Sequence, residues 1–344
     1  MNSAETKIKK ESKNRIRVEF DRTPLIQRLR AKFLNFYTLK RVLWYLFRLL
    51  LLIGVSYIIL FPFFSKISSS FMSESDFVDV TVRLVPKNPT LDTYKAIITE
   101  NNYFKAFGNT LVLSLVCGIL QTFVCCLIGY GFAKFKFKGS NLLFFVVIFT
   151  MVVPHTTLRL SMFMKFKDFD ILGIMTLLNK IGLIPKPGLQ LLNTNWPLWI
   201  LSATGLAYKN GLFIFLMRQF YRGIPDELEE SAYLDGSGVF KTFFSIIIPN
   251  SVTMMVTVFM FSFCWQWTDT FYTNVFYTQT GALLLSKIVK VPASLSEMSS
   301  ASSGLYTAAI RNTCGLLIIF PLILLYLVGQ KYIVQGIERS GITG

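Results

Sequence analysis

The sequence predicts an all-α polytopic membrane protein with six transmembrane helices, and its composition supports this fold class. Hydrophobic residues make up 53% of the 344 positions and charged residues only 16%, whereas soluble domains carry about 25% charged residues. The mean hydropathy is +0.51. The apolar residues also gather into runs close to the ~20 residues that cross a bilayer. These features exclude an ordinary soluble enzyme and a disordered chain.

Six apolar runs have lengths that suit transmembrane helices. We predict spans at residues 42–64, 106–133, 141–162, 196–217, 246–271 and 309–330. Arg48 lies near the start of the first span, where its side chain can extend to the interface. Arg159 near the end of the third span and Lys209 inside the fourth make these two the least regular.

Basic residues predict the orientation, because Lys and Arg accumulate on cytoplasmic segments. Residues 1–41 contain 12 Lys or Arg and four acidic residues, which accounts for +8 of the net +16 charge. The link 134–140 adds three lysines and no acid. We therefore expect a cell-membrane protein with both termini in the cytoplasm. Residues 1–41 would form a basic cytoplasmic extension and residues 42–344 the membrane domain.

The basic excess favours one partner, the lipid bilayer, since it lies beside a membrane span where anionic headgroups gather. No nucleic-acid partner is expected. All five cysteines lie inside apolar runs and there is a single histidine, His155, a pattern that favours neither a disulfide framework nor a metal site. We expect His155, which follows Pro154, to be a hydrogen-bonded residue at a helix kink.

The loop between the fourth and fifth spans carries the most information. Pro225 suits the first turn of a helix, and several acidic residues follow it near the positive helix end. Gly236 is placed to end this helix in a backbone conformation of positive φ. A second helix would then run from Val239 through Pro249 into the fifth span. A short helix outside the membrane between two spans is typical of a docking element for a soluble partner.

A spaced pattern of residues crosses this loop. Its members are Glu230, Ser231 and Ala232, then Gly236 after three residues, Ile246 after nine more, and Ile248 with Pro249 after one further residue. The pattern resembles the EAA motif of ABC importer permeases, with Ser231 in place of an alanine and Ile248 in place of a leucine. Further resemblance lies in residues 86–94, 108–111, 132–139, 216–225 and 330–344. The similarity extends from about residue 42 to the end and is greatest to the smaller permease of maltose-type carbohydrate importers.

The resemblance implies an import machine with several subunits. A second homologous permease would share the pathway, an extracytoplasmic solute-binding protein would deliver a sugar or oligosaccharide, and two ABC ATPase subunits would hydrolyse ATP. The chain itself would be non-catalytic and hold no cofactor, in line with the lack of a Gly-x4-Gly-Lys-Ser/Thr phosphate loop. The 225–236 helix would couple to the ATPases. The predicted coupling residues are Glu229, Glu230, Ser231, Ala232, Asp235, Gly236 and Pro249.

Polar and aromatic residues at membrane depth are candidates for the solute pathway, because polar groups there are costly. Trp rings stack against sugar rings, while amide and carboxylate groups bind hydroxyls. The candidates are Lys209, Asn210, Trp265, Gln266, Trp267 and Asp269. The structural alternative is an aromatic belt at the interface with polar groups that satisfy one another between helices.

Two other classes of membrane protein compete with a permease. A secondary transporter is expected to contain internal repeats and broken helices, and the six runs show neither clearly. A non-transporting scaffold subunit fits the hydropathy but leaves the pattern of residues 224–249 unexplained. The permease interpretation accounts for both features.

Overall fold

The computed structural model describes residues 36–341 apart from positions 172, 184, 186–187, 280–281 and 297–302. Within this part of the chain the regular structure is helical and no strand occurs; two isolated bridges join Met72 with Pro89 and Phe169 with Leu189. The predicted all-α fold is confirmed. Two compact units divide after Phe64. The predicted boundary after residue 41, which depends on topology, stays a prediction.

The first unit consists of most of one long helix. Helix α3 (Phe36–Ser69) has 34 residues and contains the whole predicted span 42–64. At 1.5 Å per residue it is about 50 Å long, more than the ~30 Å of hydrocarbon in a bilayer. Pro62 lies inside its last turns. The N-terminal extension before residue 36 lies outside the described residues.

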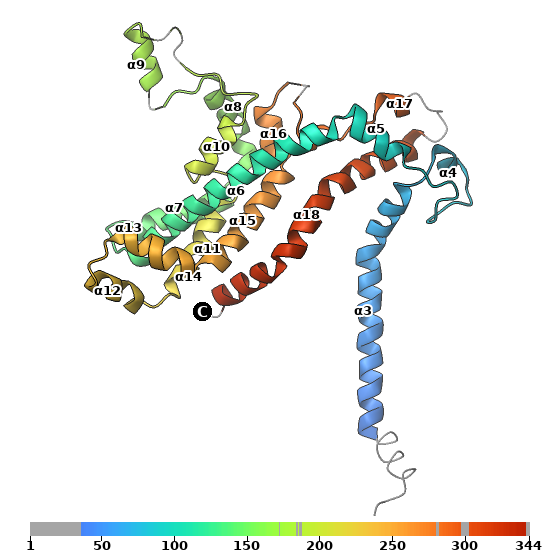
Figure 1. Ribbon diagram of the computed structural model, residues 1–344, viewed down its shortest axis with the longest axis horizontal. Coiled ribbons are helices and arrows are strands. Elements are labelled where there is room, and N and C mark those ends of the chain that lie inside the picture. Colours follow the sequence, from blue (N-terminus) through green and yellow to red (C-terminus); the bar gives the residue numbers. More distant parts are fainter. Residues whose placement is uncertain are drawn as a thin grey trace, which may run out of the picture. The chain divides into compact units, whose positions relative to one another are not determined.

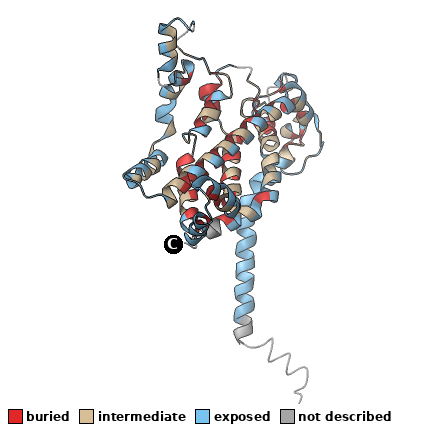
Figure 2. Ribbon diagram, turned by 60° about the vertical axis from the view of Figure 1, so that its left-hand side comes forward, coloured by how far each residue is buried: buried red, intermediate tan, exposed pale blue. Residues whose placement is uncertain are grey.

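Helix α6 (Tyr103–Lys134) is the centre of the second unit (Figure 1). It packs against α10 (Trp196–Ala203), α11 (Asn210–Arg222) and α15 (Val252–Trp267). Helix α15 also packs against α18 (Ser303–Gly341). Figure 2 shows that buried residues concentrate on these packed helices. The core of the fold is therefore a helical bundle around α6.

Small residues allow helices to approach α6 closely, as in other membrane bundles. A Cβ atom added to Gly129 would lie 2.7 Å from the Cβ atom of Met217 on α11 and 3.1 Å from the backbone nitrogen of Arg218. One added to Gly118 would lie 3.0 Å from the ring of Phe259 on α15. The Gly129 contact is shorter than real Cβ contacts, so the crossing of α6 and α11 requires glycine, while a side chain at position 118 would force the Phe259 ring to shift.

Among the described residues, three helices are each long and apolar enough to cross a membrane, and they contain the predicted first, second and sixth spans. The predicted third and fifth spans are not straight. Ser140–Val152 and His155–Lys167 meet at 92°, and Val239–Asn250 and Val252–Trp267 meet at 78°. If each bent pair is one span, five candidates result. The count of six stays a prediction.

Proline accounts for both bends. Pro154 lies at the first, and Pro249 lies two residues before the second, at Ser251. A proline lacks the N–H that would bond to the preceding turn. Around Pro249 the helix adopts a π turn over Phe243–Ile247, and the Ser251 amide is shared between the carbonyls of Ile247 and Ile248. Such local adjustments are usual where a helix bends.

The predicted fourth span, residues 196–217, is not one continuous helix. It is divided into α10 and α11 by residues 204–209. Gly205 and Lys209 have φ angles of 74° and 66°, which belong to the left-handed region and cannot continue a right-handed helix. The sequence marked this span as irregular at Lys209 but did not predict the break, because a single glycine and a single lysine within an apolar run do not by themselves end a helix.

The remaining elements are short. They are α4 (Glu74–Val78), α5 (Asp92–Glu100), α7 (Ser140–Val152), η1 (His155–Leu158), α8 (Arg159–Lys167), α9 (Ile174–Lys180), α12 (Glu227–Leu234), α13 (Val239–Thr242), η2 (Phe243–Ile247), α14 (Ile248–Asn250), α16 (Phe271–Phe276), η3 (Leu285–Lys287) and α17 (Ala293–Ser296).

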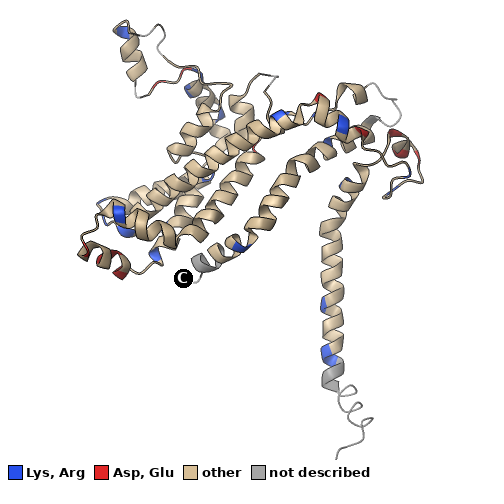
Figure 3. Cartoon of the chain, viewed as in Figure 1, with Lys and Arg blue, Asp and Glu red and all other residues tan. Residues whose placement is uncertain are grey.

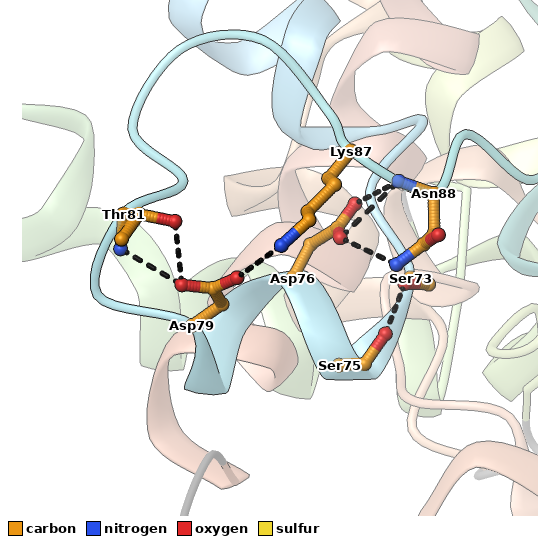
Figure 4. Close-up of polar contacts among 7 residues, drawn as sticks. All are labelled: Ser73, Ser75, Asp76, Asp79, Thr81, Lys87 and Asn88. Atoms are coloured by element: carbon orange, nitrogen blue, oxygen red, sulfur yellow. Dashed lines mark hydrogen bonds and ion pairs between the residues drawn. The ribbon is translucent and has the colours of Figure 1, made fainter.

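Two carboxylates order the segment between α4 and α5 (Figure 4). Buried Asp76 accepts hydrogen bonds from the backbone and side-chain amides of Asn88, at 3.1 and 3.2 Å. Asp79 accepts bonds from the Thr81 hydroxyl at 2.7 Å and from Lys87 at 3.1 Å. These bonds, that of the Thr81 hydroxyl above all, lower the pKa of Asp79 to about 2. The segment is therefore held by local bonds rather than by an apolar core.

The close crossing of α6 and α11 gives a test with a matched control. We expect Gly129→Val to lower the thermal unfolding midpoint of the purified chain by roughly 2 to 8 °C, because overpacking costs about 1–3 kcal/mol. Gly131→Val, two residues on in the same helix, should leave the midpoint unchanged, since nothing lies within 4 Å of its added Cβ. Equal midpoints for the two variants would contradict the packing described.

Candidate functional site

Helix α12 is a short helix with hydrogen-bonded ends, as the sequence predicts. The carbonyl of Asp226 accepts bonds from the amides of Glu229 and Glu230, both at 3.0 Å. At the other end Gly236 has a φ of 77°. The Gly236 amide bonds to the Tyr233 carbonyl and the Ser237 amide to the Ala232 carbonyl, at 3.0 and 2.9 Å. This pair of bonds is a Schellman motif, and the expectation of positive φ at Gly236 is confirmed.

Lys134, the last residue of α6, fastens α12 to the bundle. Its side chain is 8% exposed. The ammonium group donates to the carbonyl of Ile224 at 2.6 Å, lies 3.2 Å from the carboxylate of Glu229 and pairs with Asp226. The Tyr130 hydroxyl donates to Glu229 at 2.5 Å. The hydrogen bond from Lys134 is the main reason that the pKa of Asp226 lies below its usual value.

The predicted coupling residues divide between two faces of α12. Glu229 and Ala232 are buried, at 6% and 5% exposure, and face the bundle. Glu230, Ser231, Asp235 and Gly236 are exposed. Pro249 is also exposed but belongs to α14. The buried face is thus an anchor and the outer face is open.

The outer face of α12 combines acidic and apolar groups. Leu234 is 89% exposed and Leu228 and Tyr233 are each 41% exposed. Figure 3 shows acidic residues along the same helix. An exposed apolar patch with a polar rim is typical of a protein contact.

A cavity of about 920 Å³ lies inside the bundle. Its walls come from the end of α7 and η1, the break between α10 and α11 with the first turn of α11, and the segment from α15 to α16. The polar and aromatic groups among its lining residues include His155, Tyr208, Lys209, Asn210, Trp265, Asp269 and Tyr272. A mostly apolar wall with a few polar groups is the usual character of a ligand site.

Four of the six candidate pathway residues line this cavity: Lys209, Asn210, Trp265 and Asp269. The Lys209 ammonium lies 4.8 Å from the ring centre of Tyr208 and 5.7 Å from that of Trp265, within the range of cation–π attraction.

Asp269 also has a structural role. Its carboxylate accepts bonds from the amides of Tyr272 and Thr273, at 3.2 and 2.8 Å, and from the Thr273 hydroxyl at 3.0 Å. It thereby caps the start of α16.

Trp267 and Gln266 do not line the cavity. The Trp267 indole is 1% exposed, donates to the Ile318 carbonyl at 2.9 Å, and packs against Phe107 and Phe263. The side-chain nitrogen of Gln266 is buried without a hydrogen-bond partner among the described residues. Successive helical residues point about 100° apart, so Trp265 and Trp267 face different neighbours. The sequence grouped them by composition and did not separate the two faces.

His155 lies at the kink after Pro154 and is hydrogen-bonded, as expected. Its Nδ1 atom lies 3.2 Å from the Tyr272 hydroxyl, and its ring packs edge-on against Tyr208. Neither tyrosine was predicted from the sequence as a lining residue, and neither Tyr130 nor Lys134 was predicted as an anchor of α12. The available signal for the anchor was a lysine at the end of an apolar run in a chain that also carries an acidic loop at residues 226–235.

Comparison with known proteins shows the family of this chain. Residues 126–339, which include α12 and the cavity, match the family described as binding-protein-dependent transport system inner membrane component. The chain belongs to this family. Among its relatives are sugar ABC transporter permeases, so the resemblance predicted from the loop is confirmed.

Two relatives illustrate the similarity. The arabinooligosaccharides transport system permease protein AraQ of Bacillus subtilis is 28% identical over 296 residues, which cover 84% of this permease and 92% of the relative. The maltodextrin transport system permease protein MalD of Streptococcus pneumoniae is 28% identical over 315 residues, which cover 90% and 99%.

One solved structure supports the fold. It is a bacterial ABC transporter involved in the import of the acidic polysaccharide alginate, and it superposes with a TM-score of 0.64 at 18% identity. The match covers 87% of this permease and 99% of that chain.

The anchor of α12 can be tested by amide hydrogen exchange. Lys134→Gln leaves Glu229 buried without its cation, which costs about 3 kcal/mol. We expect exchange in residues 225–238 to become up to about 100-fold faster, as 1.4 kcal/mol corresponds to a factor of ten. Lys138→Gln removes an exposed lysine of the same link and should not alter exchange. Unchanged exchange in Lys134→Gln would refute the anchor.

Replacement of Trp267 should mainly lower stability, whereas replacement of Trp265 should mainly lower solute uptake. Trp267→Ala removes a fully buried ring and should destabilise the permease by about 3 kcal/mol or more, seen as a lower thermal midpoint. Trp265→Ala, a half-buried cavity residue, should give a smaller midpoint shift but a larger loss of solute uptake per assembled complex. The reverse ranking in uptake would remove Trp265 from the candidate site.

Proposed function

We propose that this chain is the membrane permease subunit of an ATP-driven importer that carries a sugar or oligosaccharide. Membership in the family and the similarity to oligosaccharide permeases support the class of protein. The observation that carries the proposal is α12, which is fixed to α6 on one face and exposes acidic and apolar groups on the other.

In this proposal α12 couples the permease to two ABC ATPase subunits. Its outer face, with Glu230, Ser231, Asp235 and Gly236, docks on an ATPase that binds and hydrolyses the ATP. Because Lys134 joins Glu229 to the end of α6, a displacement of α12 is passed to a helix of 32 residues. Rocking of packed helices then exposes the pathway to each side in turn.

The cavity forms part of the solute pathway. Trp265 and Tyr208 offer ring faces to sugar rings, while Asp269 offers a carboxylate to hydroxyls. An extracytoplasmic solute-binding protein delivers the solute, and a second homologous permease completes the route. The permease itself is non-catalytic and needs no cofactor.

We propose six spans with both termini in the cytoplasm. The basic residues on segments 1–41 and 134–140 support this orientation, and it places α12 on the ATPase side. In this arrangement α10 and α11 together make the fourth span.

A substitution at Gly236 tests the coupling. We expect Gly236→Asp to reach the membrane and assemble, while solute uptake and solute-stimulated ATP hydrolysis fall together by more than about tenfold. No atom of this chain lies within 4 Å of a Cβ added there, so the new side chain would meet the ATPase surface instead. The left-handed backbone adds roughly 1 kcal/mol or more. Glu230→Ala should have a milder effect, since it removes one exposed charge.

Gly139 supplies the matched control. It has a φ of 88° and open space around its added Cβ, and it lies on the 134–140 link. Gly139→Asp therefore has a similar backbone cost without altering α12, and uptake should stay near the wild-type rate. Wild-type uptake by Gly236→Asp would refute the docking of α12. Uptake that persists without the ATPase subunits would instead favour a secondary transporter, and no uptake of any solute a scaffold.

A further inference from the structure

In the proposed six-span topology, the break in the fourth span places a helix start inside the membrane. Helix α11 has 13 residues, so it rises about 20 Å from its end at Arg222, while the hydrocarbon of a bilayer is about 30 Å thick. Its first residues, Asn210, Gly211 and Leu212, line the cavity. The N-terminal end of a helix carries a positive partial charge and attracts anions.

Lys209 adds a full positive charge at the same point. It precedes α11 directly, in the left-handed conformation that few non-glycine residues adopt. Among the residues that the structure describes, no carboxylate lies within the 4.0 Å of an ion pair with its ammonium. Its neighbours are the rings of Tyr208 and Trp265. Uncommon backbone conformations of this kind gather at functional sites.

Asn210, the next residue, is a buried polar residue without a partner. It is 1% exposed, and neither its side-chain oxygen nor its side-chain nitrogen has a hydrogen-bond partner within the described part of the chain. A buried polar group without a partner costs about 1–3 kcal/mol, and it lies in the wall of a cavity large enough for a ligand.

The other polar groups of the cavity already have partners. Asp269 is the carboxylate among the lining residues, and its oxygens accept bonds from the amides and hydroxyl at the start of α16. His155 contacts the Tyr272 hydroxyl. The Lys209 ammonium is the charged group of the lining that has no ion pair or hydrogen bond with any described residue.

We propose that this cavity recognises the carboxylate of an acidic sugar, a uronate unit within an oligosaccharide, through Lys209 and the start of α11. The inference deepens the proposed carbohydrate pathway and rests on it. The carboxylate pairs with the ammonium, and the rings of Tyr208 and Trp265 cover the sugar faces. A neutral sugar would leave the ammonium without an anion.

The test uses the importer as assembled, with both permeases and the ATPases, in lipid nanodiscs. Radiolabelled trigalacturonate and trimannuronate are compared with their fully methyl-esterified forms, which have the same shape but no charge. Equilibrium dialysis measures the Kd for the wild type, Lys209→Gln, Lys209→Arg and Lys167→Gln. Lys167 is an exposed lysine at the end of α8 that does not line the cavity, so its substitution controls for loss of one charge.

We expect at least one acidic form to bind the wild type about 10- to 100-fold more tightly than its ester, the range for a hydrogen bond to a charged group. Lys209→Gln should abolish this preference, whereas Lys209→Arg and Lys167→Gln should keep it. Thermal midpoints and co-purification of the ATPases verify that Lys209→Gln is assembled.

Other outcomes separate this inference from the proposed function. Equal binding of acids and esters, or a preference that survives in Lys209→Gln, overturns the uronate assignment and leaves carbohydrate import intact. If Lys209 binds an anionic lipid headgroup instead of a uronate, acids and esters would likewise bind equally. If neither form binds, and the importer with its binding protein takes up no neutral or acidic oligosaccharide, both proposals fail.

Discussion

The buried pair of Lys134 and Glu229 is the contact on which the rest of the arrangement depends. Each side chain is at most 8% exposed, and a charge taken out of water is costly unless a partner and hydrogen bonds compensate it. The Ile224 carbonyl and the Tyr130 hydroxyl supply those bonds. Because any separation would leave a charge uncompensated, α12 and α6 keep one relative position.

Helix α6 links the anchor to the cavity. At its C-terminal end it holds α12 through Lys134, and along its length it packs against α11, whose first turn lines the cavity. Glycine at position 129 brings the two backbones together, with no room for a side chain. Since close-packed helices move as units, a displacement at α12 would reach Lys209 and Asn210 through two helices.

The break between α10 and α11 lies at a cavity, which makes it compatible with the proposed fourth membrane span. Backbone groups freed from a helix are costly in hydrocarbon and are tolerated where they line a cavity or are buried in protein. The left-handed residues Gly205 and Lys209 end one helix and start the next. The break thereby presents a helix start, a lysine and a buried amide to the same space.

The sequence by itself determined the fold class, the long helices near residues 42–64, 106–133 and 309–330, and the α12 helix with its final Gly236. Hydropathy, proline and glycine are local signals, and each of these features depends on local chemistry. The family was also readable, because the spacing of the loop pattern from Glu230 to Pro249 lies within one stretch of chain.

Only the tertiary structure decided which side chains share a face or meet across the bundle. It separated Trp265 from Trp267, turned Glu229 inward toward Lys134, and placed Tyr208 beside Lys209 in the cavity. Glu229 and Lys134 are far apart along the chain, and their pairing depends on how α6 and α11 cross. Packing, which no local pattern encodes, settled these contacts.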